Sequence, residues 1–189
     1  MKITLTGPRS VGKTTVSKIV AKKLKLNYVS SDKMGEKALK KVGGLDKAIK
    51  SGFIKEFIKK RGYVLILDQY NKDNFVFDLS VGSFTSTEFK RASREVRSVA
   101  KKNSLIVGIL PSKDDRESIK ILYTREIKRD HFKNVDNSVL LERTKIRYPE
   151  QKEILLKNCN IIIYIKGKTP IKIANEIVKS INNLKCKRK

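Results

Sequence analysis

The 189-residue chain contains no tryptophan, only two cysteines, four prolines and one histidine. Cys159 and Cys186 match no metal-ligand spacing, which favours free thiols over a zinc site. No apolar run approaches the roughly 20 residues of a membrane-spanning helix, so we expect no membrane contact. The first residues already have the pattern of a strand, so we expect no signal peptide before the fold. Together these absences favour a cytoplasmic protein.

Acidic residues are also scarce, because 44 Lys and Arg stand against 19 Asp and Glu, and the formal net charge is +25. Two interpretations are open. A basic surface gains affinity for RNA by releasing counterions, which would suit a nucleic-acid or ribosome partner. Alternatively the excess is compositional, because Lys, Ile and Asn are all abundant and the lysines are scattered along the chain. We favour composition, while expecting such a surface to attract anionic substrates and to contact RNA nonspecifically.

Apolar residues make up 39% of the chain and alternate between strand and helix patterns, which predicts one domain over residues 1–184 and a basic tail at 185–189. We expect a monomer. The pattern predicts a three-layer α/β fold, with a five-stranded parallel sheet covered by helices on both faces. Residues 61–70 fit a strand or a helix, and we favour the helix because parallel strands need a long crossover. The expected strands are 2–6, 27–31, 74–79, 104–110 and 160–165, and the expected helices are 13–24, 33–42, 45–60, 87–102 and one that begins at Thr169-Pro170.

The segment between the first strand and the first helix carries the pattern Gly-x4-Gly-Lys-Thr. Glycines let a backbone wrap closely around an anion, and the positive end of the helix adds to the attraction. Lys13 is expected to reach the β- and γ-phosphates of ATP, and the Thr14 hydroxyl to ligate Mg²⁺. The pattern therefore predicts a nucleotide-phosphate-binding loop made of Gly7, Pro8, Arg9, Ser10, Val11, Gly12, Lys13, Thr14 and Thr15.

Beyond this loop the chain, from Met1 to about Ile181, resembles shikimate kinases and related small-molecule kinases of the nucleoside-monophosphate-kinase-like P-loop group. The family has an acidic pair after the second strand, and this sequence has Ser30-Ser31-Asp32. The resemblance implies that Asp32 contacts substrate hydroxyls, although an aspartate there also suits a helix N-cap. Asp78, at the end of the third strand, has the position of a Walker B acid that would hold the magnesium shell. Capping of the following turn would also explain Asp78.

The resemblance further implies that helices at about 33–61 bind the acceptor. The family's Phe-Arg arginine, which grips the substrate carboxylate, falls nearest to Lys59 and Arg61, although a solvated helix face explains both residues equally. The family has three consecutive glycines that lie against the substrate, and only Gly82 matches them here. The side chain of Val81 would narrow the substrate pocket at this place.

A small lid is expected at about 112–135. Arg129 matches the lid arginine that closes onto the phosphates, and Arg125 would lie near the adenine. His131, in the same segment, is expected to be solvated. Arg147, in Arg-Tyr-Pro, resembles a second carboxylate contact, although an exposed arginine before a turn would also fit.

Pro170 resembles the family's adenine-side loop. The function that these features imply is ATP-dependent phosphoryl transfer to a hydroxyl of a small anionic metabolite, with shikimate the leading candidate. ATP and Mg²⁺ would be the cofactors, and Lys13, Asp32 and Arg129 the catalytic residues. Two alternatives stay open: a nucleoside-monophosphate kinase, and an NTP-binding RNA- or ribosome-associated factor with weak ATPase activity. Lysines gathered on one face would favour the RNA factor.

Overall fold

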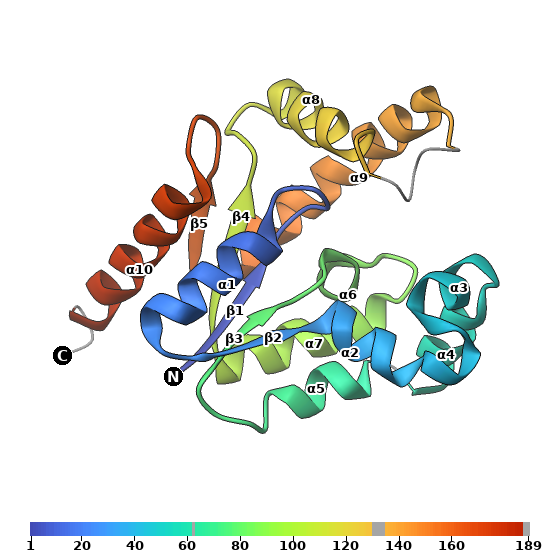
Figure 1. The fold of residues 1–189 in the computed structure, drawn as a ribbon, viewed down its shortest axis with the longest axis horizontal. Coiled ribbons are helices and arrows are strands. Elements are labelled where there is room, and N and C mark those ends of the chain that lie inside the picture. Colours follow the sequence, from blue (N-terminus) through green and yellow to red (C-terminus); the bar gives the residue numbers. More distant parts are fainter. Residues whose placement is uncertain (62, 130–134, 187–189) are drawn as a thin grey trace.

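The structure of the protein is a computed structural model that describes residues 1–61, 63–129 and 135–186. A five-stranded parallel sheet in the order β2-β3-β1-β4-β5 forms its centre (Figure 1). The two strands that flank β1 are apolar and buried along almost their whole length, as expected for a parallel sheet covered on both faces. The strands are β1 (Lys2–Thr6), β2 (Asn27–Ser30), β3 (Phe75–Asp78), β4 (Leu105–Leu110) and β5 (Ile161–Tyr164).

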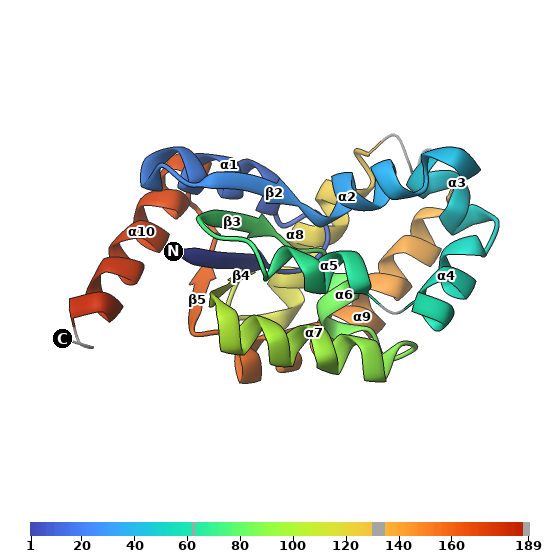
Figure 2. The same ribbon diagram turned by 90° about the horizontal axis from the view of Figure 1, so that it is seen from below.

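Helices cover both faces of this sheet. They are α1 (Lys13–Leu24), α2 (Ser31–Ala38), α3 (Gly44–Lys50), α4 (Phe53–Arg61), α5 (Val64–Gln69), α6 (Val81–Thr85), α7 (Lys90–Asn103), α8 (Asp115–Glu126), α9 (Asn137–Asn158) and α10 (Pro170–Cys186), with a short 3-10 helix at Lys40–Val42. Helices α1 and α10 pack together on one face, and α7 lies on the other, where α9 also contacts β4 (Figure 2). This architecture confirms the predicted three-layer fold.

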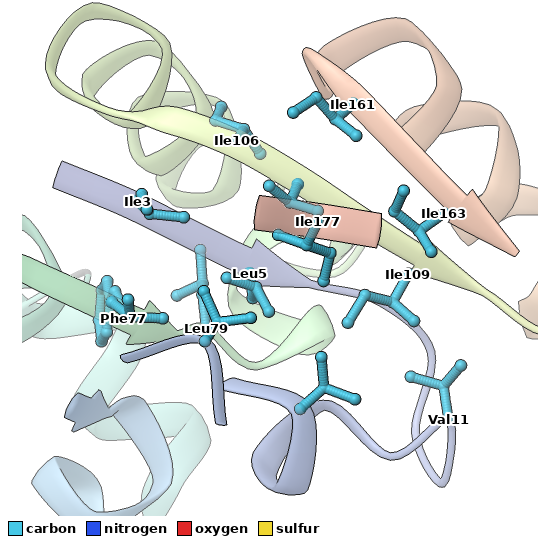
Figure 3. Packing of buried hydrophobic residues seen from close by; sticks show 14 of the residues in the cluster. Ile3, Leu5, Val11, Phe77, Leu79, Ile106, Ile109, Ile161, Ile163 and Ile177 are labelled. Atoms are coloured by element: carbon cyan, nitrogen blue, oxygen red, sulfur yellow. The ribbon is translucent and has the colours of Figure 1, made fainter. Parts of the chain in front are cut away.

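The core lies between the sheet and these helices. Its side chains come from the strands β1, β3, β4 and β5, from α1 and from the helices α5 to α10. One residue of the loop after β1, Val11, also belongs to it (Figure 3). The participation of Val11 anchors the loop in the core. Members drawn in Figure 3 include Ile3, Leu5, Val11, Phe77, Leu79, Ile106, Ile109, Ile161, Ile163 and Ile177.

The ambiguous segment 61–70 contains a helix, α5, as we favoured. Ile66 and Gln69 are buried, and so is Tyr70 just after the helix. The Tyr70 ring packs edge-on against Phe75 and Phe77, with centroid distances of 6.1 and 5.7 Å. Its hydroxyl shares a hydrogen bond of 3.1 Å with Thr4 Oγ1 in the central strand. This packing fixes the short helix against the sheet and leaves β3 to begin at Phe75.

The helices after β2 differ from the prediction at their boundaries. Helix α2 begins at Ser31, because the Ser30 hydroxyl caps it by accepting a hydrogen bond from the Lys33 amide at 3.4 Å. Asp32 is therefore in the first turn and is not the N-cap. The predicted helix 45–60 is interrupted at Ser51-Gly52, where Gly52 has a φ of +78°. A positive φ is accessible mainly to glycine, and it turns the chain between α3 and α4.

Helices α8 and α9 were not predicted, and α8 lies in the region 112–135 that was interpreted as a lid. Asp114 caps α8 by accepting a hydrogen bond from the Glu117 amide at 2.7 Å, and α8 packs against α9. The alternative for Arg147, an exposed arginine before a turn, is wrong, because Arg147 lies inside α9, which continues through Pro149 and buries Tyr148. The predicted lid residues 130–134, including His131, and residues 187–189 of the tail lie outside the described residues.

None of the helices in the described ranges is long and apolar enough to cross a membrane.

Gly108 in the middle of β4 gives a test of how tightly the sheet packs. An added Cβ would lie 2.6 Å from Ile162 Cδ1 and 2.9 Å from Cys159 Sγ. We expect Gly108→Ala to lower the free energy of unfolding by about 1–3 kcal/mol, because overpacking forces neighbours off their rotamers. Urea unfolding measures this, with the exposed Ser98→Ala on α7 as a control expected within about 0.5 kcal/mol of the parent. An unchanged midpoint for Gly108→Ala would contradict this packing.

Candidate active site

The loop between β1 and α1 approaches the sheet so closely that its first residue must be glycine. A Cβ on Gly7 would lie 2.3 Å from the backbone oxygen of Ile109 in β4. At the other end Gly12 has a φ of +98°, which glycine adopts without strain. Ser10 also has a positive φ, of 64°, and its buried hydroxyl has no hydrogen-bond partner among the described residues. Such backbone conformations cluster at ligand-binding loops.

Helix α1 begins directly after this loop, and its N-terminus is arranged for an anion. Every residue of the loop and helix is described, and no side chain caps the first turn, which also holds no acidic residue. The amides of that turn therefore keep their positive end for an external anion. The Lys13 ammonium donates to the carbonyl oxygens of Gly7 and Pro8, at 2.9 and 3.3 Å, so it lies across the loop.

The Thr14 hydroxyl donates to Asp78 Oδ2 at 2.7 Å, which joins the start of α1 to the end of β3. The Tyr28 hydroxyl, from β2, donates to the same oxygen at 3.1 Å. Burial, followed by the negative charge of Asp78, raises the pKa of Tyr28 to about 12, so this hydroxyl stays a donor at neutral pH. Asp78 is therefore held by two side chains and does not cap the following turn, where Ser80 caps α6 instead.

Thr14 and Asp78 together fit a magnesium ion. Both offer oxygen, the ligand that Mg²⁺ prefers, and Mg²⁺ needs few protein ligands when phosphates and water supply the rest. Ser30, at the position of the family's first acid, uses its hydroxyl to cap α2. Asp78, on the strand next to the loop, is therefore the carboxylate that lies beside Thr14.

A second pair of hydrogen bonds joins the ends of β2 and β3. The Ser31 hydroxyl donates to the carbonyl of Asp78 at 3.2 Å and accepts from the Ser80 amide at 2.9 Å. These bonds fix the start of α2 beside the start of α6. As a result the exposed Asp32 side chain and the residues after Ser80 lie at the same edge of the sheet.

These groups line a cavity of about 980 Å³. On one side are Lys13, Thr14 and Asp78, and the α6 residues Val81 and Gly82 lie nearby. Asp32 and Arg147, two of the predicted acceptor residues, line the same cavity, and their roles stay predictions. The cavity is also lined by three further arginines from the loop, the end of α8 and α9, and by apolar side chains of α2, α4 and α5; the arginines are Arg9, Arg129 and Arg143.

The cations around this cavity perturb one another. Burial lowers the pKa of Lys13, Asp78 and Asp32 oppose this, and Arg129 and Arg9 add to the lowering. Burial also lowers the pKa of Arg9, which Glu126 opposes through an ion pair of 3.5 Å. Mutually repelling cations around a phosphate loop favour an anionic ligand, whose charge relieves the repulsion.

The predicted residues Lys59 and Arg61 are not in the cavity, and the expected third cationic wall needs correction. Helix α4 turns Ile54, Phe57 and Ile58 toward the cavity, which leaves Lys59 on the solvent side, where it pairs with Glu56 at 3.6 Å. Arg61 is exposed at the end of the helix. The i, i+3, i+4 spacing of the apolar residues explains this orientation, so the wall is apolar.

Two predicted adenine-side residues also lie outside the cavity. Arg125 donates to the carbonyls of Val11 and Ser10, at 3.2 and 3.5 Å, and so lies along the outside of the loop. Pro170 is the first residue of α10, away from the lining. Roles for both residues beside the adenine stay predictions.

Sequence reasoning missed two residues that the structure brings to the site, Tyr28 and Arg143. Tyr28 lies two residues before Ser30 on an edge strand, and nothing in its sequence context indicates a polar partner. Arg143 did have a signal, because it precedes Arg147 by four residues, which is the spacing of one helix face. That signal required recognising α9 as a helix despite Pro149.

A phosphate loop between the central strand and α1, with a carboxylate at the end of the neighbouring strand, defines the P-loop nucleotide-binding class. A family model described as an AAA domain matches residues 2–80. A search of curated protein sequences finds no match to this chain.

Solved structures share the fold over nearly the whole chain. The shikimate kinase from Aquifex aeolicus is 20% identical with a TM-score of 0.69, covering 98% of this chain and 99% of that one. The shikimate kinase from Acinetobacter baumannii in complex with shikimate is 20% identical with a TM-score of 0.64, covering 97% and 94%. A deoxyadenosine kinase from M. mycoides is 16% identical with a TM-score of 0.56, covering 97% and 100%. The chain therefore has the shikimate kinase-like P-loop fold.

Lys13 tests the phosphate loop directly. Lys13→Ala should leave the fold intact and weaken ATP binding by about tenfold or more, because a charge-assisted contact to phosphate is worth about 1.5–3 kcal/mol. Titration calorimetry with ATP measures this. Lys22→Ala, an exposed lysine of the same helix, serves as the control and should bind within about twofold of the parent. Equal affinities for both variants would remove Lys13 from the nucleotide site.

Variants of Asp78 and Ser30 test which of the two residues binds Mg²⁺. Asp78→Asn should remove most of the gain in nucleotide affinity that Mg²⁺ gives, because an amide is a much poorer Mg²⁺ ligand than a carboxylate. Ser30→Ala should keep that gain, while losing about 0.5–2 kcal/mol of stability with the α2 cap. Calorimetry of ADP with and without Mg²⁺, beside urea unfolding, separates the two effects. Equal loss of the Mg²⁺ gain in both variants would count against Asp78.

Proposed function

We propose that this protein transfers the γ-phosphoryl group of ATP to a hydroxyl of a small anionic metabolite. One observation carries the proposal: the phosphate loop, the Thr14–Asp78 pair, Asp32 and an arginine-rich wall all line a single cavity. Phosphoryl transfer depends mainly on positioning and electrostatic stabilisation, and it needs nucleotide, metal and acceptor groups together. The fold shared with shikimate kinases supports the same reading.

In the proposed reaction the acceptor oxygen forms a bond to the γ-phosphorus while the bond from that phosphorus to the β–γ bridging oxygen breaks, releasing ADP. Asp32 orients the acceptor hydroxyl and takes its proton. Lys13 and Arg129 neutralise the charge on the moving group, as a lysine and a lid arginine do in this chemistry. Thr14 and Asp78 hold Mg²⁺, which neutralises phosphate charge when bound. Arg147 holds the anionic group of the acceptor.

Shikimate is the first acceptor to test, since the solved structures that share this fold include shikimate kinases. Nucleoside-monophosphate kinase activity is the alternative that uses the same loop with a different acceptor. The RNA-factor alternative loses support, because exposed lysines lie on α1 on one face of the sheet and on α7 on the other (Figure 2). The excess of basic residues is thus spread over both faces of the sheet and is not gathered on one RNA-binding face.

An ADP-release screen tests the proposal. With Mg-ATP, a hydroxy acid from a panel that includes shikimate should stimulate ADP formation, and Asp32→Asn should reduce that rate by about 10²–10⁴-fold while leaving ATP affinity within about twofold. Lys37→Gln, an exposed residue of α2 outside the cavity lining, is the matched control. Stimulation by AMP, CMP or dUMP alone would establish the monophosphate-kinase alternative instead. ADP formation that no acceptor stimulates would contradict both.

A further inference from the structure

Helix α9 presents two arginines, Arg143 and Arg147, to the cavity. Arg143 and Arg147 are one helical turn apart, on the stripe that also includes the buried Leu140, Thr144 and Tyr148. Within the described ranges neither arginine has a carboxylate at ion-pair distance, and the neighbouring Glu142 pairs with Lys145 at 3.6 Å. Like charges at this spacing destabilise a helix, and a bound anion would reverse that effect.

Apolar side chains from the segment between α2 and α5 form one part of the cavity wall, beside the charged Lys33 and Glu36 of α2. Met34, Leu39, Ile54, Phe57, Ile58 and Val64 line it. Every residue of α4 is described and none of them is buried, although Ile54, Phe57 and Ile58 line the cavity. Val64 is 39% exposed. When a ligand covers apolar side chains that are accessible inside a cavity, the burial of their surface favours binding.

The size of the cavity agrees with a ligand that reaches this wall. Its volume is about 980 Å³, and its lining extends from Lys13 to Val64 and Ile66 of α5. A compact hydroxy acid held at Asp32 and Arg147 would leave much of the α4 surface uncovered. Added Cβ atoms on Gly82 would meet nothing within 4 Å, so the floor at α6 also leaves room.

We propose that the phosphoryl acceptor is a hydroxylated acid with an aromatic or similarly apolar ring body, which rests on the proposed function above. Arg143 and Arg147 hold its carboxylate, Asp32 holds its hydroxyl, and its ring system lies against Phe57 and Ile58. Arg143 acts as a specificity residue beside Arg147. The acceptor is thereby distinguished from small, fully polar hydroxy acids.

Binding of 6-hydroxy-2-naphthoate tests this directly. It carries a carboxylate, a hydroxyl and an aromatic body, and its fluorescence is free of tryptophan background because the chain has no Trp. Without nucleotide, we expect it to bind at least about tenfold more tightly than shikimate, by fluorescence anisotropy and calorimetry. Arg143→Gln should weaken naphthoate binding by about tenfold. Lys60→Gln, an exposed cation of α4 outside the cavity, should bind like the parent.

Phe57→Ser separates the ring contact from the anion contact. It should weaken naphthoate binding by about tenfold and shikimate binding by less than about twofold. Circular dichroism checks the fold of this variant. Arg143→Gln replaces an exposed side chain of the cavity wall, so it tests the proposal without disturbing the core. The proposal would be overturned if shikimate bound as tightly as the naphthoate, or if neither Arg143→Gln nor Phe57→Ser weakened naphthoate binding. So would tighter binding of AMP or CMP than of the naphthoate.

Failure of the proposed function has a different signature. If the naphthoate binds as expected but Mg-ATP phosphorylates no acceptor, the ligand class stands and the kinase proposal fails. If shikimate is phosphorylated and the naphthoate neither binds nor reacts, the kinase proposal stands and the ligand class fails.

Discussion

The close approach of the phosphate loop to the sheet is the constraint on which the site depends. Gly7 lies so near the Ile109 carbonyl that no side chain fits between them. Val11, which is 2% exposed, also holds the loop in place because its side chain packs into the core (Figure 3). The loop therefore cannot shift without breaking sheet packing, and the amides of α1 keep a fixed direction. A preorganised anion site of this kind needs little rearrangement when phosphate binds.

The strand order turns this fixed loop into a site. Because β1 lies between β3 and β4, the end of β3 brings Asp78 to hydrogen-bond distance of Thr14. Strand β2 comes next, and Ser31 ties its end to β3, which brings Asp32 to the same edge. Ligands of open parallel sheets bind at the carboxyl ends of the strands, where these residues converge. The chemistry of the site thus follows from which strands are neighbours.

Local patterns in the sequence predicted the sheet, the phosphate loop and the helix at 64–69, because each depends on residues close together in the chain. Asp78 was also predictable, as an acid that ends an apolar strand. The residues that form the walls around the proposed acceptor site could not be predicted in this way. The direction of Lys59 depends on how α4 packs, and the role of Arg143 depends on α9 continuing through Pro149, which reads locally as a helix end. Tyr28 meets Asp78 across 50 residues, a separation that no local pattern encodes.

Phosphorus NMR of the protein with Mg-ATP and a mixture of hydroxy acids tests the central claim, that the cavity joins a nucleotide to a metabolite acceptor. We expect the γ-phosphate resonance of ATP to disappear while the resonances of ADP and of one phosphomonoester grow in equal amounts. Growth of inorganic phosphate without a phosphomonoester would identify an ATPase with no acceptor in the cavity, and would contradict the account.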